Sequence, residues 1–211
     1  MAREVTIFAV AAFTGARRGE VGGLFWENYR DDAIHITQSL WHGRMTQPKT
    51  RKSKGAIPVL APLAKRLEYH RSRLGNPTSG PMFPNEVGKT MDLNNLLNRV
   101  ILPTLNRCVH CQQARSSHVL SDHDFQRDSK LPEWHGWHAA RRGLGTNLYR
   151  LGVHEKTIQA ILRHANVSTT NTYYIKTAAA DTQAAMAKLE IEIMGNKWAT
   201  DVVPPQTATI Q

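Results

Sequence analysis

Short apolar stretches with helical spacing recur along the chain, and the first covers residues 4–13. This stretch is apolar on nearly all sides, which predicts a helix buried in a folded domain. Thr14-Gly15 would end it, before a second helix over residues 16–25. Further helices are predicted at residues 62–74, 92–102, 138–151, 157–162 and 178–194. The pattern therefore predicts a mainly helical fold.

Extended segments are predicted in the N-terminal third of the chain. Apolar and polar residues alternate from Ala33 to Leu40, and residues 56–59 form a second short extended run. A basic connection, residues 49–55, lies between them. These segments predict a small antiparallel sheet with a charged connection. The expected fold class is therefore α+β, mainly α-helical.

The segment from Asn106 to Trp137 loses this periodicity and gains cysteine, histidine and charged residues. We interpret it as an insertion between helices, with its Cys/His-rich part at about residues 106–130. Trp134 and Trp137 at its end are expected to pack against the start of the following helix. Residues 195–211 are expected to form a flexible C-terminal tail.

The composition favours a folded protein with an anionic partner. Of 211 residues, 41% are hydrophobic, unlike the make-up of disordered chains. No apolar run approaches the roughly 20 residues needed to cross a bilayer, which excludes an integral membrane protein. The 27 Lys and Arg against 17 Asp and Glu give a net charge of +10, which indicates nucleic acid or an anionic membrane surface as partner. The N-terminal apolar stretch does not fit a secretion signal, so we expect a cytoplasmic protein.

Three segments carry candidate chemistry: residues 14–20 (TGARRGE), 138–141 (HAAR), and 162–164 (LRH) followed by residues 169–174 (TTNTYY). In this order and with these separations they resemble the catalytic domain of the tyrosine recombinases, the phage integrase family. The resemblance covers roughly residues 5–190. It implies the fold of that catalytic domain, and DNA cleavage by a tyrosine that forms a covalent 3′-phosphotyrosyl intermediate.

The resemblance assigns the phosphate-binding roles. Arg17 and Arg141 would clamp the non-bridging oxygens of the scissile phosphate, for which bidentate guanidinium groups are suited. His138 would handle the proton of the nucleophile, and His164 would donate a hydrogen bond to the same phosphate. Glu20 matches a family acid that supports the arginine clamp, since a carboxylate beside the phosphate would repel it.

A lysine and a tyrosine complete the expected catalytic set. Lys49 best matches the family lysine that protonates the leaving 5′ oxygen, and Lys52 and Lys54 are competitors. Alternatively, all three lysines only contact phosphates. Tyr174 is favoured as nucleophile over Tyr173, because the family often has a basic residue two positions later and Lys176 stands there.

The only two cysteines, Cys108 and Cys111, are followed by His118 and His123. Thiolates and imidazoles at these intervals could bind a structural zinc ion, with His110 as a further candidate ligand. The alternative is a reduced pair of thiols on a mobile loop. The cleavage chemistry itself should need no cofactor, because the phosphotyrosyl link conserves the energy of the phosphodiester.

The resemblance also sets the expected organisation. Residues 1–194 would form the catalytic domain, and the helical core-binding domain that usually precedes it is expected to be absent, so that the chain is a fragment or works with a partner. Double-stranded DNA is the expected substrate, and helix 178–194 could dock on a neighbouring protomer in a tetramer on DNA or cover its own domain. A type IB topoisomerase-like or resolution activity and a non-catalytic DNA-binding remnant are the alternatives to recombination or integration.

Overall fold

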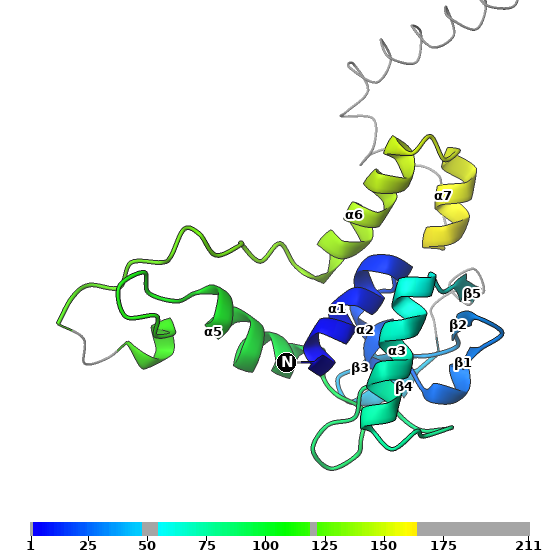
Figure 1. Ribbon diagram of the computed structural model, residues 1–211, viewed down its shortest axis with the longest axis horizontal. Coiled ribbons are helices and arrows are strands. Elements are labelled where there is room, and N and C mark those ends of the chain that lie inside the picture. Colours follow the sequence, from blue (N-terminus) through cyan, green and yellow to red (C-terminus); the bar gives the residue numbers. More distant parts are fainter. Residues whose placement is uncertain (1, 48–54, 119–121, 164–211) are drawn as a thin grey trace, which may run out of the picture. The chain divides into compact units, whose positions relative to one another are not determined.

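The computed structural model describes residues 2–47, 55–118 and 122–163, all within the first of two units into which the chain divides, residues 1–170. Figure 1 labels the elements. The predicted helix 178–194 and the predicted tail 195–211 lie outside the described residues. No helix in the described part of the chain has the length and apolar character needed to cross a lipid bilayer.

The first predicted helix is present as α1, Ala2–Thr14. Its end is set by Thr14, whose hydroxyl donates to the Val10 carbonyl at 2.6 Å and accepts from the Ala16 backbone N–H at 3.1 Å. Gly15 follows with a φ of +60°, which turns the chain away from the helix axis. Helix α2, Arg18–Gly22, begins directly afterwards.

Helix α2 has five residues, and the helix predicted over residues 16–25 is therefore too long. The cause is close packing of α2 on strand β3, Ser39–Trp41. A Cβ atom on Gly19 would lie 2.5 Å from Ser39 Oγ, and one on Gly23 would lie 3.2 Å from the Ser39 backbone. The glycines permit this approach, and a single 3₁₀ turn, η1 (Trp26–Asn28), follows instead of more α-helix.

The predicted small antiparallel sheet is present with strand order β1-β2-β5, formed by Tyr29–Arg30, Ala33–Ile36 and Gly55–Pro58. Ile34 of β2 pairs with Ile57 of β5, and both side chains are buried. The alternating stretch 33–40 is not one strand, because β3 leaves this sheet and pairs with β4, Arg44–Thr46, in a separate hairpin. The hairpin was not predicted.

The other helices predicted within the described residues are confirmed with small changes of boundary: α3 (Ala61–Arg73), α4 (Leu93–Leu96), the π-helical turn η3 (Leu97–Ile101), α5 (Leu102–Leu105), α6 (Trp137–Arg150) and α7 (Glu155–Leu162). Helices α4, η3 and α5 follow one another directly, and Asp92 caps the first of them. Pro103 has no N–H to donate within the helix. This missing hydrogen bond explains the wider π-helical turn directly before α5. One further 3₁₀ turn, η4 (Arg115–Ser117), lies in the Cys/His-rich segment.

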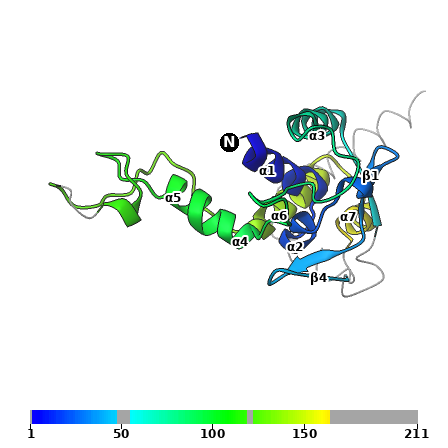
Figure 2. The ribbon, with the colours of Figure 1, turned by 90° about the horizontal axis from the view of Figure 1, so that it is seen from below.

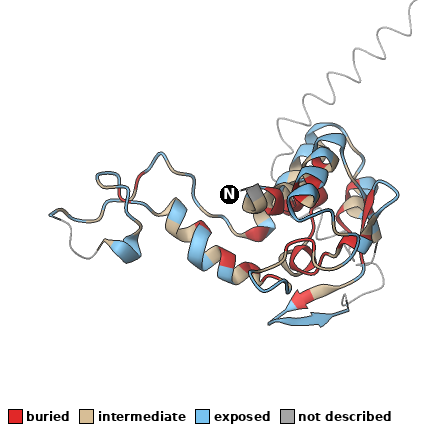
Figure 3. Ribbon diagram, turned by 60° about the horizontal axis from the view of Figure 1, so that its bottom comes forward, coloured by how far each residue is buried: buried red, intermediate tan, exposed pale blue. Residues whose placement is uncertain are grey.

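Helix α1 is central to the core, because it packs against both α3 and α6, as Figure 2 shows. Figure 3 shows the buried residues gathered in these helices and the sheet, while the segment 106–130 is mostly exposed. As expected, Trp137 at the start of α6 packs into the core, stacked on Phe8 of α1 with ring centroids 5.5 Å apart. Trp134 makes a T-shaped contact with the same Phe8 ring. The first turn of α6 is thus fixed on α1.

Candidate functional site

Gly15 lies where the three sequence motifs meet. Its carbonyl oxygen accepts a hydrogen bond of 2.6 Å from Nη1 of the buried Arg141, a residue 126 positions away. The Nη2 atom of Arg141 donates to the carbonyl of Leu162, at the end of α7. A Cβ atom on Gly15 would lie 2.8 Å from Leu162 Cδ2, and φ is +60° at this position, so glycine fits the contact with the least strain. One guanidinium group therefore joins the segments that carry all three motifs.

Arg17 stands directly before α2 and is oriented by Glu20. Its Nη1 donates to Oε1 of Glu20 at 2.8 Å, and its backbone N–H donates to Oε2 of the same carboxylate, also at 2.8 Å. Glu20 is only 3% exposed. The Arg17 side chain is itself about one-third exposed, at 36%, so the guanidinium is held in place yet remains open to solvent and to an anion.

Sequence reasoning missed Arg163, which is the second partner of Glu20. Its Nη2 donates to Glu20 Oε2 at 2.7 Å, and both side chains are almost fully buried. Burial alone would raise the pKa of Glu20, but the charges of Arg163 and Arg17 and the hydrogen bonds to Arg17 hold it below its usual value. Glu20 is therefore a charged carboxylate between two guanidinium groups.

Arg163 has an unusual backbone for an arginine. It caps α7 in the left-handed region, with φ +53° and ψ +45°, where glycine is the commonest residue. Its side chain lies against Gly55 of β5, since a Cβ atom there would be 3.3 Å from Arg163 Cδ. Its Nε and Nη1 atoms are buried without a hydrogen-bond partner among the described residues. A charged residue in a helix-ending position next to a motif histidine was the sequence signal that could have revealed it.

His138 lies in the first turn of α6, three residues before Arg141, and its side chain is exposed. Partial burial of the ring, followed by the positive charges of Arg141, Arg17, Arg142 and Arg18, lowers its pKa. The imidazole is therefore neutral near pH 7 and able to accept a proton. The charges that keep it neutral would also attract an anion to the same place.

Six predicted catalytic or competing positions lie outside the described residues. These are the lysine group of the basic connection, Lys49, Lys52 and Lys54, together with His164, Tyr173 and Tyr174. The described residues next to them are in contact: Gly55 follows the lysine connection, Arg163 precedes His164, and the two pack together.

The predicted metal ligands lie together in the Cys/His-rich segment. One ligand atom from each of Cys108, Cys111, His118 and His123 lies within 4.8 Å of the others. Both cysteines are free thiols. His110 is not part of this group, although its ring is near that of His123, because its Nε2 bonds to Oε1 of Gln126 at 3.3 Å.

The electrostatics of this cluster favour a thiolate. Burial alone would raise the pKa of the Cys108 thiol, but backbone N–H groups of the surrounding turns, first that of Cys111, and the His123 ring lower it to about 5. The hydrogen bond that His123 donates to the Asp122 carboxylate, together with those to the two sulfur atoms, raises the pKa of His123 to about 9. The residues present thus offer charged sulfur and imidazole donors at one point.

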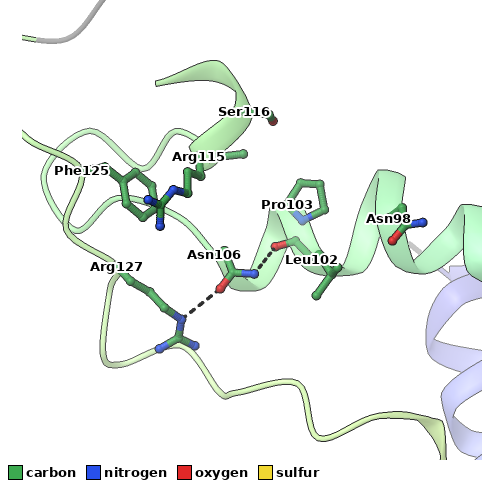
Figure 4. Close-up of a pocket in the computed structure, with 9 residues that line it drawn as sticks. Asn98, Leu102, Pro103, Asn106, Arg115, Ser116, Phe125 and Arg127 are labelled. Carbon is green, nitrogen blue, oxygen red and sulfur yellow. Dashed lines mark hydrogen bonds between the residues drawn. The ribbon is translucent and has the colours of Figure 1, made fainter. Parts of the chain in front are cut away.

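A pocket of about 430 Å³ lies between α5 and the Cys/His-rich segment (Figure 4). Arg127 Nε donates to Oδ1 of Asn106 at 3.2 Å, and Asn106 Nδ2 donates to the carbonyl of Leu102 at 3.1 Å. Across the pocket, Arg115 lies over the ring of Phe125 at 5.2 Å. We call Arg17, Glu20, His138, Arg141 and Arg163 the arginine site. None of these residues lines the pocket, which belongs to the base of the insertion.

A mainly helical fold with small antiparallel sheets, and arginines brought together from distant segments, define a protein of the integrase class. The model of the phage integrase family matches residues 1–180, and the chain belongs to that family.

The relatives agree with this assignment. A tyrosine recombinase XerC-like protein of Caldanaerobacter subterraneus subsp. tengcongensis is 25% identical over 195 residues, covering 80% of this chain and 44% of that protein. The integrase of transposon Tn1549, solved in complex with circular intermediate DNA, has a TM-score of 0.63 and 20% identity, over 87% of this chain and 59% of that one. XerA recombinase has a TM-score of 0.52 and 19% identity, over 82% of this chain and 51% of that one. The fold is that of the tyrosine recombinase catalytic domain, and the chain spans less than half the length of the XerC-like relative.

Proposed function

We propose that this chain is the catalytic part of a site-specific DNA recombinase or integrase, which cleaves and rejoins DNA through a covalent 3′-phosphotyrosyl intermediate. The observation that carries the proposal is the contact of Arg141 with Gly15 of the first motif and with Leu162, the first residue of the third. Membership of the phage integrase family supports it.

In the proposed reaction, Arg17 and Arg141 bind the non-bridging oxygens of the scissile phosphate. Charge grows on these oxygens as the phosphorus becomes five-coordinate, so fixed guanidinium groups stabilise the transition state more than the ground state. Glu20 and Arg163 act through Arg17, because Glu20 binds both arginines and so holds the Arg17 side chain at the start of α2. His138 accepts the proton of the attacking phenol, and His164 donates a hydrogen bond to the phosphate.

The proposed covalent step exchanges one phosphate ester for another. The phenol oxygen of Tyr174 forms a bond to phosphorus while the bond to the 5′ oxygen breaks, and Lys49 gives a proton to that oxygen. Attack by a 5′ hydroxyl of the same or another strand reverses the step and releases the tyrosine. Since no high-energy bond is consumed, no nucleotide is required, and the arginines and the lysine take the charge-stabilising and proton-donating roles that a metal can have in such reactions.

Double-stranded DNA is the proposed partner, and the net charge of +10 supports binding to a polyanion. In the Tn1549 structures a related fold is held in complexes with DNA. We further propose assembly into a tetramer on paired DNA, in which each protomer exchanges one strand. A reaction on DNA inside the cell would place the protein in the cytoplasm.

Covalent capture tests the proposal without knowledge of the target sequence. The full chain is incubated with fragmented DNA of the source organism in EDTA, the mixture is denatured, and protein-linked DNA is recovered and sequenced. We expect adducts at a small number of related sites, carrying the protein on the 3′ end. Tyr174→Phe should abolish them and Tyr173→Phe should retain them.

Each other outcome has a definite meaning. Loss of adducts in Tyr173→Phe alone moves the nucleophile to Tyr173. Adducts spread evenly over all sequences favour a topoisomerase-like relaxation activity, because relaxation needs no specific site. DNA that is retained by the chain but never linked to it would contradict the enzymatic proposal and leave a DNA-binding protein.

A further inference from the structure

The side chains of the Cys/His-rich segment are spaced as ligands of a tetrahedral ion. His118 Nε2 lies 3.1 Å from His123 Nε2, which in turn lies 3.4 Å from Cys108 Sγ. In a tetrahedral zinc site the ligand atoms lie about 3.3–3.8 Å apart, given zinc–nitrogen and zinc–sulfur bonds of about 2.1 and 2.3 Å. These two separations differ from the tetrahedral values by a few tenths of an ångström, and all four ligand atoms lie within 4.8 Å of one another, a spread that side-chain rotations can close.

The tautomer of His123 suits a metal ligand. Its Nδ1 lies 2.7 Å from the Asp122 carboxylate, so Nδ1 carries the proton and donates it. A metal ion that displaces the remaining ring proton would therefore bind Nε2, which lies near Cys108 Sγ and His118 Nε2. A carboxylate that orients a histidine from outside is the usual support of a metal-bound imidazole.

The segment has little other reason to be ordered. Between residues 106 and 130, only Cys108 and Asp128 are buried among the described residues. Its backbone is held by a few hydrogen bonds, among them Cys108 N–H to Gln113 and Gln112 N–H to Cys108, each 2.9 Å long. A segment without an apolar core needs another source of stability, and metal binding is a common one.

We propose that Cys108, Cys111, His118 and His123 bind one structural zinc ion. Two thiolates and two imidazoles favour zinc over magnesium or calcium, which prefer oxygen ligands. The four ligands fill a tetrahedral shell and leave no open position, which distinguishes a structural from a catalytic site. The ion would hold both ends of the insertion, because Cys108 lies opposite Arg127 and the latter bonds to the carbonyls of Leu131 and Pro132.

Metal content tests the zinc site with a matched control. The chain is purified under reducing conditions from zinc-containing medium and analysed by elemental mass spectrometry, with one zinc ion per chain as the expected result. Cys108→Ser, Cys111→Ser and His118→Ala should each lose most of the metal. His110→Ala should keep it, because that ring lies beside the cluster but bonds to Gln126. Equal loss in His110→Ala and His118→Ala would overturn the assignment.

Cobalt substitution covers the case in which a variant fails to fold. The unmodified chain, freed of metal and loaded with Co²⁺, should show the intense absorption of tetrahedral cobalt and a sulfur-to-cobalt charge-transfer band. Both thiols should react with a thiol reagent only after a chelator is added. A weak octahedral spectrum, or a reduced chain that takes up no metal, would overturn the proposal. Neither result bears on covalent capture, which is carried out in EDTA.

Discussion

The carboxylate of Glu20 is buried between Arg17 and Arg163, and its charge is needed by both. Glu20→Gln keeps the shape of the side chain but removes the charge from an almost fully buried ion pair. Since breaking a buried pair leaves an uncompensated cation, we expect the free energy of unfolding to fall by about 3–5 kcal/mol. Urea denaturation measures this difference. Glu86→Gln, at an exposed position, is the control and should change stability by less than about 0.5 kcal/mol.

We also expect the charge of Glu20 to make the stability of the fold depend on pH in the acid range. The pKa of Glu20 is lowered in the folded protein, so the stabilisation is fully present above the usual value of 4.5 and is lost as the pH falls through the folded value. The unmodified chain should therefore lose stability below about pH 4.5 more steeply than Glu20→Gln. Parallel slopes in the two proteins would show that Glu20 is not charged in the fold.

The role of general acid can be assigned to Lys49, and not to Lys52 or Lys54, by a substrate whose leaving group needs no proton. In a DNA substrate with sulfur in place of the bridging 5′ oxygen, the cleaved strand leaves as a thiolate, and this leaving group needs no proton. Lys49→Ala should therefore cleave ordinary DNA at least about 100-fold more slowly, as expected for loss of a general acid, yet cleave the sulfur substrate at nearly the unmodified rate. The two other lysine variants should slow both substrates alike. Rescue of Lys52→Ala or Lys54→Ala would reassign the acid.

Among the residues of the candidate site, the sequence predicted Arg17, Glu20, His138 and Arg141 but gave no role to Arg163. Arg17, His138 and Arg141 could be selected because their spacing matches known motifs, and Glu20 could be selected with Arg17. The role of Arg163 depends on a left-handed backbone and on a partner 143 positions away. Neither property is a local pattern: the sequence shows only an arginine at a helix end beside a motif histidine, and the folded chain gives its role.

At the scale of elements, α1, α6 and α7 meet at Gly15, and this contact is sensitive to one methyl group. Gly15→Ala would place Cβ 2.8 Å from Leu162 at a positive φ, so we expect a loss of about 2–4 kcal/mol in stability and of adduct formation. Gly143→Ala is the matched control, because nothing lies within 4 Å of its Cβ position in α6. It should be neutral or stabilise the protein by up to about 1 kcal/mol. Thermal unfolding compares them, and equal effects would contradict the packing argument.

Helices α1, α3 and α6 were predictable because each covers more than two turns with apolar positions at helical spacing and is followed by glycine, at Gly15, Gly75 and Gly152. The β3–β4 hairpin was not, because its residues 41–47 are exposed and give no alternating pattern. Its turn, His42-Gly43, has two positive φ values, as hairpin turns require. The length of α2 was wrong for a different reason: contacts with β3 ended the helix where local propensity would have continued it.

At the scale of the whole molecule, positive charge is concentrated around His138, where Arg17, Arg18, Arg141 and Arg142 all act on its pKa. A phosphate chain laid across this place would release counterions, so DNA affinity should fall steeply with salt. The question is whether this location matters or only the net charge of +10.

Two substitutions that each remove one positive charge, at different places, distinguish the effect of location from that of net charge. Arg142→Gln and Arg73→Gln each remove one exposed positive charge, but Arg73 lies in α3 and acts on His70 instead of His138. Binding to a labelled duplex is measured by fluorescence anisotropy over a range of salt concentrations. Arg142→Gln should reduce the slope of log affinity against log salt by about 1, the value for one lost phosphate contact, and Arg73→Gln should leave it unchanged. Equal reductions would mean that total charge, and not the arginine site, determines how this chain binds DNA.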